Sequence, residues 1–142
     1  MIKLDAYKMD GLGNDFIIFD KRKKSISLRK DQIIKISDRK NVGCDQVIFV
    51  DKDESSGVFL KFYNSDGGEI PACGNGSRCV AYLLMKENNN KKISLKTKVG
   101  ILQAELNDKN LVSINMGQPN FEWNKIPLLK QMDNKNLEIK II

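Results

Sequence analysis

The chain has 142 residues, of which 41% are hydrophobic, enough to bury one ordinary core and to begin a second domain. No apolar run approaches the roughly 18 residues of a membrane span, and the first residues lack a signal-peptide core, so a cytoplasmic protein without a membrane partner is expected. The formal net charge is +6, but the basic residues are spread along the chain and only four are arginine, so no nucleic-acid partner is predicted.

The first half is predicted to contain strands and one helix. Strands are expected over residues 2–8, 16–20, 46–51 and 58–64, with a short one ending at Pro71. The helix is expected over residues 28–38, with Ser27 as its N-cap. Its inner side is expected to carry Ile33, Ile34 and Ile36.

The second half is predicted to begin with a helix from about Gly74 to Glu87. Because this helix is apolar most of the way round, the rest of the fold is expected to enclose it. Strands follow over residues 93–97, 102–106 and 111–116. The sum is an α/β (α+β) domain, in which a curved, mostly antiparallel sheet wraps around one central helix. This domain is expected to cover residues 1–118, and residues 119–142 would be a connection and the truncated start of a second domain.

The three cysteines, Cys44, Cys73 and Cys79, occur without CxxC spacing and without any histidine, so no metal site is predicted. If Cys73 and Cys79 lie near one helix, six residues at about 1.5 Å each separate them by roughly 9 Å. A disulfide needs Cα atoms about 4.4–6.8 Å apart, so these two are expected to stay free, with Cys79 in the core.

Cys73 directly precedes Gly74, Asn75 and Gly76, which open the predicted helix. A thiol at a helix N-terminus lies among unpaired N–H groups, which favour negative charge. This position favours a thiolate and a bound carboxylate, and so chemistry on an amino or hydroxy acid. The alternative is a buried structural cysteine beside a glycine-rich turn.

Four motifs that follow one another along the chain indicate a family resemblance. They are Gly11–Phe16, Asp38–Gln46, Phe62–Glu69 and Ala72–Cys79. Together they resemble the N-terminal half of diaminopimelate epimerase, a cofactor-independent enzyme of lysine and peptidoglycan precursor biosynthesis. The resemblance implies two such domains facing each other across a cleft, with LL-diaminopimelate inverted to the meso form without pyridoxal phosphate or any other cofactor.

The resemblance also implies roles for particular residues. Cys73 would be one of two catalytic cysteines, and Gly74 and Asn75 would offer N–H groups to the carboxylate at the reacting centre. Asn14 and Gln46 would line the same pocket. The residues alone also allow a loop cap for Asn14 and favour an exposed strand edge for Gln46. Asn64 would hold the distal amino-acid group, where the residue alone equally allows a turn former. Asp15, Asp66 and Arg78 are expected to hold loops and the helix start.

The family's second cysteine lies on the second domain, and neither Cys44 nor Cys79 matches it. This chain is therefore expected to need a second domain or complementing half as a partner, with a homodimer also open, and to be inactive alone. A non-catalytic remnant and a related amino-acid racemase of the same fold stay open. Proline racemases typically carry histidine where this chain has Asn75, and a phenazine-type isomerase would replace Cys73 by a carboxylate.

Overall fold

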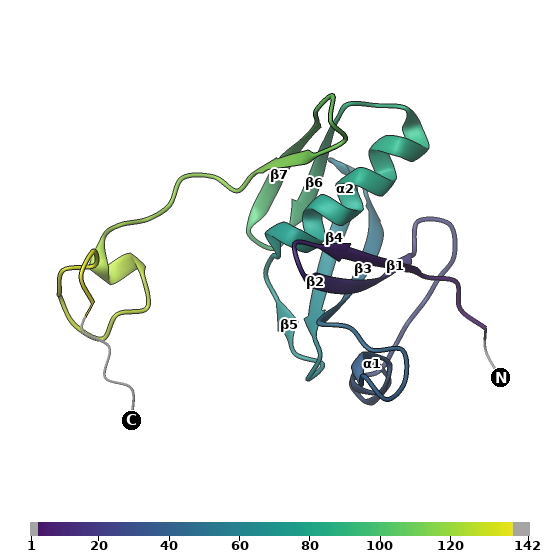
Figure 1. Ribbon diagram of the computed structural model, residues 1–142, viewed down its shortest axis with the longest axis horizontal. Helices are drawn as coiled ribbons and strands as arrows, with labels where there is room; N and C mark the ends of the chain where they lie inside the picture. The colour runs from purple at the N-terminus through teal and green to yellow at the C-terminus, as the bar shows by residue number, and fades with distance from the viewer. Residues whose placement is uncertain (1–2, 138–142) are drawn as a thin grey trace.

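The computed structural model describes residues 3–137, and within them it contains one eight-stranded sheet and two α-helices (Figure 1). The elements in chain order are β1 (Tyr7–Gly11), β2 (Asn14–Asp20), α1 (Lys30–Ser37), β3 (Gln46–Asp53), β4 (Gly57–Asn64), β5 (Glu69–Ile70), α2 (Gly74–Asn88), β6 (Lys92–Thr97), β7 (Gly100–Leu106) and β8 (Val112–Asn115).

The sheet has the order β1-β2-β3-β4-β6-β7-β8, with β5 paired to β4. The β2–β3 and β4–β6 pairs are parallel, and the other pairs of the described sheet are antiparallel. A parallel pair needs a crossover connection, and here each crossover contains a helix. Figure 1 shows the sheet curling around α2, which confirms the predicted fold class.

The two helices bury opposite faces of the sheet. On the inner face, α2 packs into a core that includes Phe16, Ile48 and Phe62. On the outer face, α1 contributes Ile33 to a second core with Ile17 and Val47. Because both faces are covered at β2 and β3, these strands carry continuous buried apolar runs, whereas β7 alternates between buried and exposed residues.

Two N-terminal elements differ from the prediction. The first strand begins at Tyr7, and it joins β2 by a two-residue turn at Leu12 and Gly13, both with positive φ (57° and 85°), instead of a longer loop. Residue 2, where that strand was expected to start, lies outside the described residues.

The first helix begins at Lys30 with Arg29 as its N-cap, so the prediction of Ser27 is wrong. The outer core takes up Ile26 and Leu28 before the helix starts, and the Gln32 side chain accepts the Arg29 N–H at 2.9 Å. Ile34 is 42% exposed and does not face the core.

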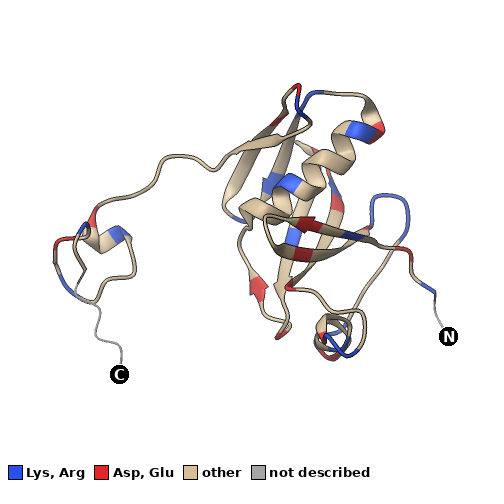
Figure 2. Ribbon diagram, viewed as in Figure 1, with Lys and Arg blue, Asp and Glu red and all other residues tan. Residues whose placement is uncertain are grey.

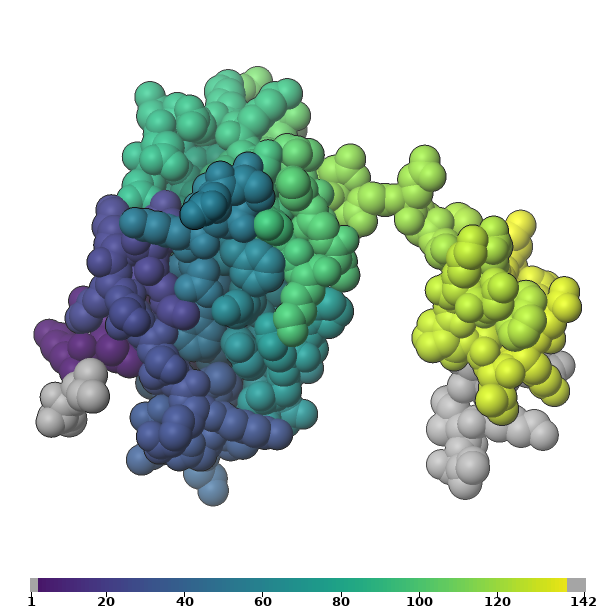
Figure 3. All heavy atoms as spheres, turned by 180° about the vertical axis from the view of Figure 1, so that it is seen from behind, coloured from purple at the N-terminus to yellow at the C-terminus, as the bar shows by residue number. Residues whose placement is uncertain are grey.

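After β8 the chain leaves the sheet and reaches a small lobe that Figures 1 and 3 show apart from the main body. The lobe contains the 3-10 turn Trp123–Lys125 and exposes Phe121 and Leu129 (71% and 99%). The last five residues of the segment expected to start a second domain, 138–142, lie outside the described residues. The boundary at residue 118 stays a prediction.

Figure 2 shows Lys and Arg interleaved with Asp and Glu along the described part of the chain. The basic turn after β2 is ion-paired to the end of α2, since Arg22 lies 2.6 Å and Lys23 3.0 Å from Glu87. None of the described helices is long and apolar enough to cross a membrane.

Candidate active site

The candidate site lies at one edge of the sheet. Asn14 begins β2, Gln46 begins β3 and Asn64 ends β4. Parallel pairing aligns Phe16 with Gln46, and antiparallel pairing aligns Gln46 with Asn64. The strand register therefore collects at one edge three amide side chains that are up to 50 residues apart in sequence.

The N-terminus of α2 reaches the same edge. Cys73 is the N-cap, with extended backbone (φ −144°, ψ 116°), and its Sγ accepts the Gly76 N–H at 3.4 Å. The Cys73 carbonyl accepts the Ser77 N–H at 2.8 Å, which closes the first turn. The N–H groups of Gly74 and Asn75 belong to that turn, where no helix carbonyl precedes them, so they add partial positive charge at the end of the helix that carries the half-buried thiol.

Gly76 explains how α2 comes so close to the strands. A Cβ at this position would lie 2.7 Å from Ile48 Cδ1, 3.2 Å from Phe62 Cε1 and 3.4 Å from Phe16 Cε1. These three side chains are fully buried. A larger residue would require either these core side chains or the first turn of α2 to move, so the glycine permits the close approach of α2 to the strands.

A chain of side-chain hydrogen bonds links this edge to the helix. Asn14 Nδ2 donates to Asp45 Oδ2 at 3.3 Å, and Asn75 Nδ2 donates to Asn14 Oδ1 at 2.6 Å. Arg78 Nη2 donates to Asn75 Oδ1. The structure thus brings the predicted residues Asn14 and Asn75 into direct contact beside Cys73.

Gln46 and Asn64 form a second amide pair, because Gln46 Nε2 donates to Asn64 Oδ1 at 2.9 Å. The other end of the Gln46 amide, Oε1, is buried and has no hydrogen-bond partner among the described residues. Buried polar atoms are nearly always paired, so an unpaired acceptor here is a place for a donor that the described chain does not supply.

The predicted roles of Asp15, Asp66 and Arg78 in holding loops and the helix start are confirmed. Asp15 accepts from Arg39 at 2.5 and 2.7 Å and from Lys8 at 2.7 Å. The Arg39 guanidinium is the main cause that holds the pKa of the Asp15 carboxyl far below its usual range. Asp66 accepts the Gly68 N–H at 2.7 Å and closes the turn after β4.

All three cysteines are free, as predicted for Cys73 and Cys79. Cys79 is 4% exposed in the inner core, where burial raises the pKa of its thiol from 9.0 to about 11. Cys44 is 2% exposed in the outer core, with its Sγ 3.5 Å from Ser37 Oγ. Only Cys73 lies at the helix start, half-buried and beside polar partners.

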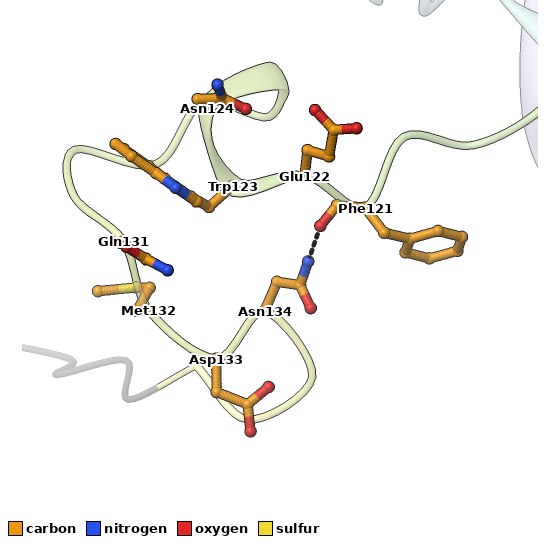
Figure 4. A pocket seen from close by; sticks show the side chains of 8 residues that line it. All are labelled: Phe121, Glu122, Trp123, Asn124, Gln131, Met132, Asp133 and Asn134. Atoms are coloured by element: carbon orange, nitrogen blue, oxygen red, sulfur yellow. Dashed lines mark hydrogen bonds between the residues drawn. The ribbon is translucent and has the colours of Figure 1, made fainter.

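Neither a metal-binding cluster nor the hollow in the C-terminal lobe offers an alternative centre among the described residues. Residues 3–137 contain no group of three His, Cys, Asp or Glu side chains that could hold a metal ion. A shallow hollow of about 390 Å³ in the C-terminal lobe contains none of the candidate site residues (Figure 4). The side chains that line it are Phe121, Glu122, Trp123, Asn124, Gln131, Met132, Asp133 and Asn134.

Sequence reasoning missed Asp45 as part of this edge. Its carboxylate accepts from Asn14 and also from the Asp15 N–H at 3.1 Å, and Arg39 Nη2 lies 2.8 Å from its other oxygen. The signal in the sequence was its position directly before Gln46 at the start of a buried strand.

Solved structures of similar fold are isomerases and relatives of a phenazine biosynthesis protein. A hydroxyproline epimerase from Agrobacterium vitis matches 78% of this chain and 40% of its own, with 16% identity and a TM-score of 0.53. A phenazine biosynthesis protein of the PhzF family from Enterococcus faecalis matches 72% of this chain and 40% of its own, with 18% identity and a TM-score of 0.56. At these identities the likeness concerns the fold alone.

Among proteins of this fold, the sequence comparisons identify one family. The profile of diaminopimelate epimerase matches residues 6–122. The diaminopimelate epimerase of Pelagibacter ubique is 50% identical over 98% of this chain and 51% of its own, and that of Phenylobacterium zucineum is 41% identical over 93% and 48%. The chain belongs to the diaminopimelate epimerase family, and it spans about half the length of the curated relatives it matches.

Proposed function

We propose that this chain supplies one half of the active site of a diaminopimelate epimerase, in which Cys73 removes or returns the α-proton on one face of the substrate. The observation that carries the proposal is the place of the Cys73 thiol as N-cap of α2, beside the N–H groups of Gly74 and Asn75. Family membership and the sequences of named relatives support the substrate class.

In the proposed reaction the Cys73 thiolate takes the α-proton and becomes a thiol, and the electron pair stays on the substrate as a carbanion stabilised through its carboxylate. A thiol on the opposite face then delivers a proton to the carbon and becomes a thiolate, so charge and protons balance and the configuration inverts. The reverse direction exchanges the two roles. No cofactor takes part in this sequence.

The binding residues would each hold a different group of the substrate. The N–H groups of Gly74 and Asn75, together with the Asn14 amide, would hold the carboxylate at the reacting centre. Gln46 would line the same pocket, and Asn64 would bind the distal amino-acid group. Neutral amides suit this task because they add no charge that competes with the thiolate.

One cysteine can serve only one face, so the second acid–base group must come from outside this set of residues. We propose that a second epimerase domain or complementing half supplies it across the cleft, and that the 142-residue chain alone shows little or no turnover. The exposed side chains of Phe121 and Leu129 in the C-terminal lobe are consistent with surface that a further domain covers.

The test is an epimerisation assay on LL-diaminopimelate in deuterated water, with this chain alone and with a separately expressed second half. We expect inversion and α-deuterium incorporation only when both halves are present. Cys73→Ser should lower the rate at least about 100-fold, because it replaces the thiol by a far weaker acid–base group. Cys44→Ala, which removes a thiol on the outer face, is the matched control and should leave the rate within a few-fold.

Robust inversion by this chain alone would show that another residue, or a second copy in a homodimer, supplies the missing acid. A stable complex of the two halves that leaves diaminopimelate unchanged would favour a different amino-acid substrate or a non-catalytic remnant. The presence of Asn75 after Cys-Gly, where proline racemases typically carry histidine, is the sequence feature that favours diaminopimelate over proline.

A further inference from the structure

We propose that Asp45 and Arg78 are positioning residues that set the orientation of the Asn14 and Asn75 side-chain amides in the candidate carboxylate site. The proposal rests on the proposed function, since it concerns how the same site binds its anionic ligand. Neither residue needs to touch the substrate. Both stand at the ends of one hydrogen-bond chain, Asp45–Asn14–Asn75–Arg78.

The two ends of this hydrogen-bond chain favour the same donor-to-acceptor direction along it. An ionised carboxylate can only accept hydrogen bonds and a guanidinium can only donate them, whereas an amide does both and can turn by 180°. Asp45 therefore selects the NH2 end of Asn14, and Arg78 selects the oxygen end of Asn75. These two choices leave the Asn14 oxygen facing the Asn75 NH2, which is the 2.6 Å contact in the structure.

If either amide turned over, two groups of the same kind would meet. A flipped Asn14 would place its oxygen against the Asp45 carboxylate, and a flipped Asn75 would place its NH2 against the Arg78 guanidinium. Each flip would replace a charge-assisted hydrogen bond by a contact between two acceptors or two donors, so each end alone favours the observed orientation. Because Asp45 and Arg78 favour the same orientation of the two amides, the hydrogen bonds run from donor to acceptor in one direction, from Arg78 to Asp45.

The hydrogen-bond chain Asp45–Asn14–Asn75–Arg78 has spare donors. Each amide NH2 has two N–H groups, and the contacts in the structure use one of them on Asn14 and one on Asn75. The oxygens of both amides already accept, from Asn75 and from Arg78. Spare N–H groups therefore remain at the start of α2, and N–H groups complement a carboxylate.

The two end residues of the hydrogen-bond chain, Asp45 and Arg78, are themselves held in place. The Asp45 carboxylate accepts the Asp15 N–H at 3.1 Å and the Arg39 guanidinium at 2.8 Å, which tie it to β2 and to the loop after α1. Arg78 lies three residues after Asn75 on α2, where side chains are neighbours. The hydrogen-bond chain thus joins three segments that are distant in sequence: the β1–β2 hairpin, the start of β3 and the start of α2.

The experiment compares Asp45→Asn, which makes the acceptor-only end ambiguous, with Arg78→Met, which removes the donor end but keeps an apolar stem. Nuclear magnetic resonance of the isotopically labelled 142-residue chain follows the side-chain NH2 signals of Asn14 and Asn75. We expect Asp45→Asn to shift the Asn75 signals and Arg78→Met to shift the Asn14 signals, although neither substituted residue contacts the amide at the far end. Arg78→Lys, which keeps a charged donor, should restore the wild-type signals.

The matched control is Asp66→Asn, since Asp66 also accepts a backbone N–H in a turn after β4 but lies outside the hydrogen-bond chain. It should leave both amide signals unchanged. Backbone spectra that match the wild type exclude unfolding as the cause of any shift. Far-end signals that do not move in either variant would overturn the proposal.

A second measurement is the affinity of the chain, combined with its second half, for meso-diaminopimelate. Asp45→Asn and Arg78→Met should each weaken binding about tenfold. The double variant should weaken it no more than about tenfold, because either substitution breaks the same hydrogen-bond chain. Independent structural roles would instead give about a hundredfold loss in the double variant, and that result would contradict the proposal.

The two measurements separate this proposal from the proposed function. If the wild type does not bind diaminopimelate but the far-end signals respond as expected, the positioning role stands and the substrate assignment fails. If diaminopimelate binds and the far-end signals do not respond, the substrate assignment stands and the positioning role fails.

Discussion

Gly76 offers the sharpest test of how α2 is seated, because an alanine there has no free space. Its Cβ would lie 2.7 Å from Ile48 Cδ1 and 3.2 Å from Phe62 Cε1, both in a fully buried part of the inner core. Added methyl groups in a packed core cost about 1–3 kcal/mol of unfolding free energy. Alanine gains about 1 kcal/mol over glycine in a helix, so the net loss for Gly76→Ala should be up to about 2 kcal/mol.

The matched control is Gly74→Ala, two residues earlier on the same helix. Its Cβ would meet Met116 Sδ at 3.6 Å, an ordinary van der Waals contact. Gly74 and Gly76 both lie in the first turn of α2, so most of the helix-propensity gain is common to the two variants and their difference reports mainly the steric contribution. We expect Gly74→Ala to be at least about 1 kcal/mol more stable than Gly76→Ala.

Urea unfolding followed by far-ultraviolet circular dichroism measures both variants against the wild type. The slope of the free energy against urea should stay the same, and only the midpoint should move. Equal midpoints for the two variants, or a higher midpoint for Gly76→Ala, would refute the claim that α2 is pressed against β2, β3 and β4 at this glycine.

Two further predictions concern the cysteines. Iodoacetamide should label Cys73 at least about tenfold faster than Cys44 or Cys79 in the folded chain, because a reactive thiol needs exposure as well as thiolate character and the other two are buried; faster labelling of Cys79, read by peptide mass spectrometry, would overturn the assignment. The folded state holds the Cys79 thiol neutral with a pKa near 11 instead of 9.0, so this group's contribution to stability is complete below pH 9 and is lost as pH rises from 9 to 11, by up to about 2–3 kcal/mol. Urea midpoints across this range should fall less steeply in Cys79→Ala than in the wild type, and identical slopes would show that the thiol ionises equally in both states.

The sequence alone determined the local elements and the helix start. The apolar run after Gly-Asn-Gly predicted α2 and placed Cys73 at its N-terminus, since the periodicity and the glycines are local signals. Alternation predicted the later strands, and cysteine spacing predicted free thiols. These features depend on neighbours in the chain, which a sequence displays directly.

The tertiary structure decided where α1 begins and which of its side chains are buried. Ser27 is a good N-cap by residue type, but Ile26 and Leu28 enter the outer core, so the helix starts after them. Ile34 faces solvent because only one side of this short helix meets the sheet.

Tertiary structure also decided which polar groups of the site meet. Asn14 and Asn75 are 61 residues apart and touch only because Gly76 lets α2 approach the strands, and Gln46 meets Asn64 only through the β3–β4 register. Asp45 entered the site for the same reason. Contacts of this kind depend on strand register and helix docking, which are set by burial over the whole domain and leave no local pattern in the sequence.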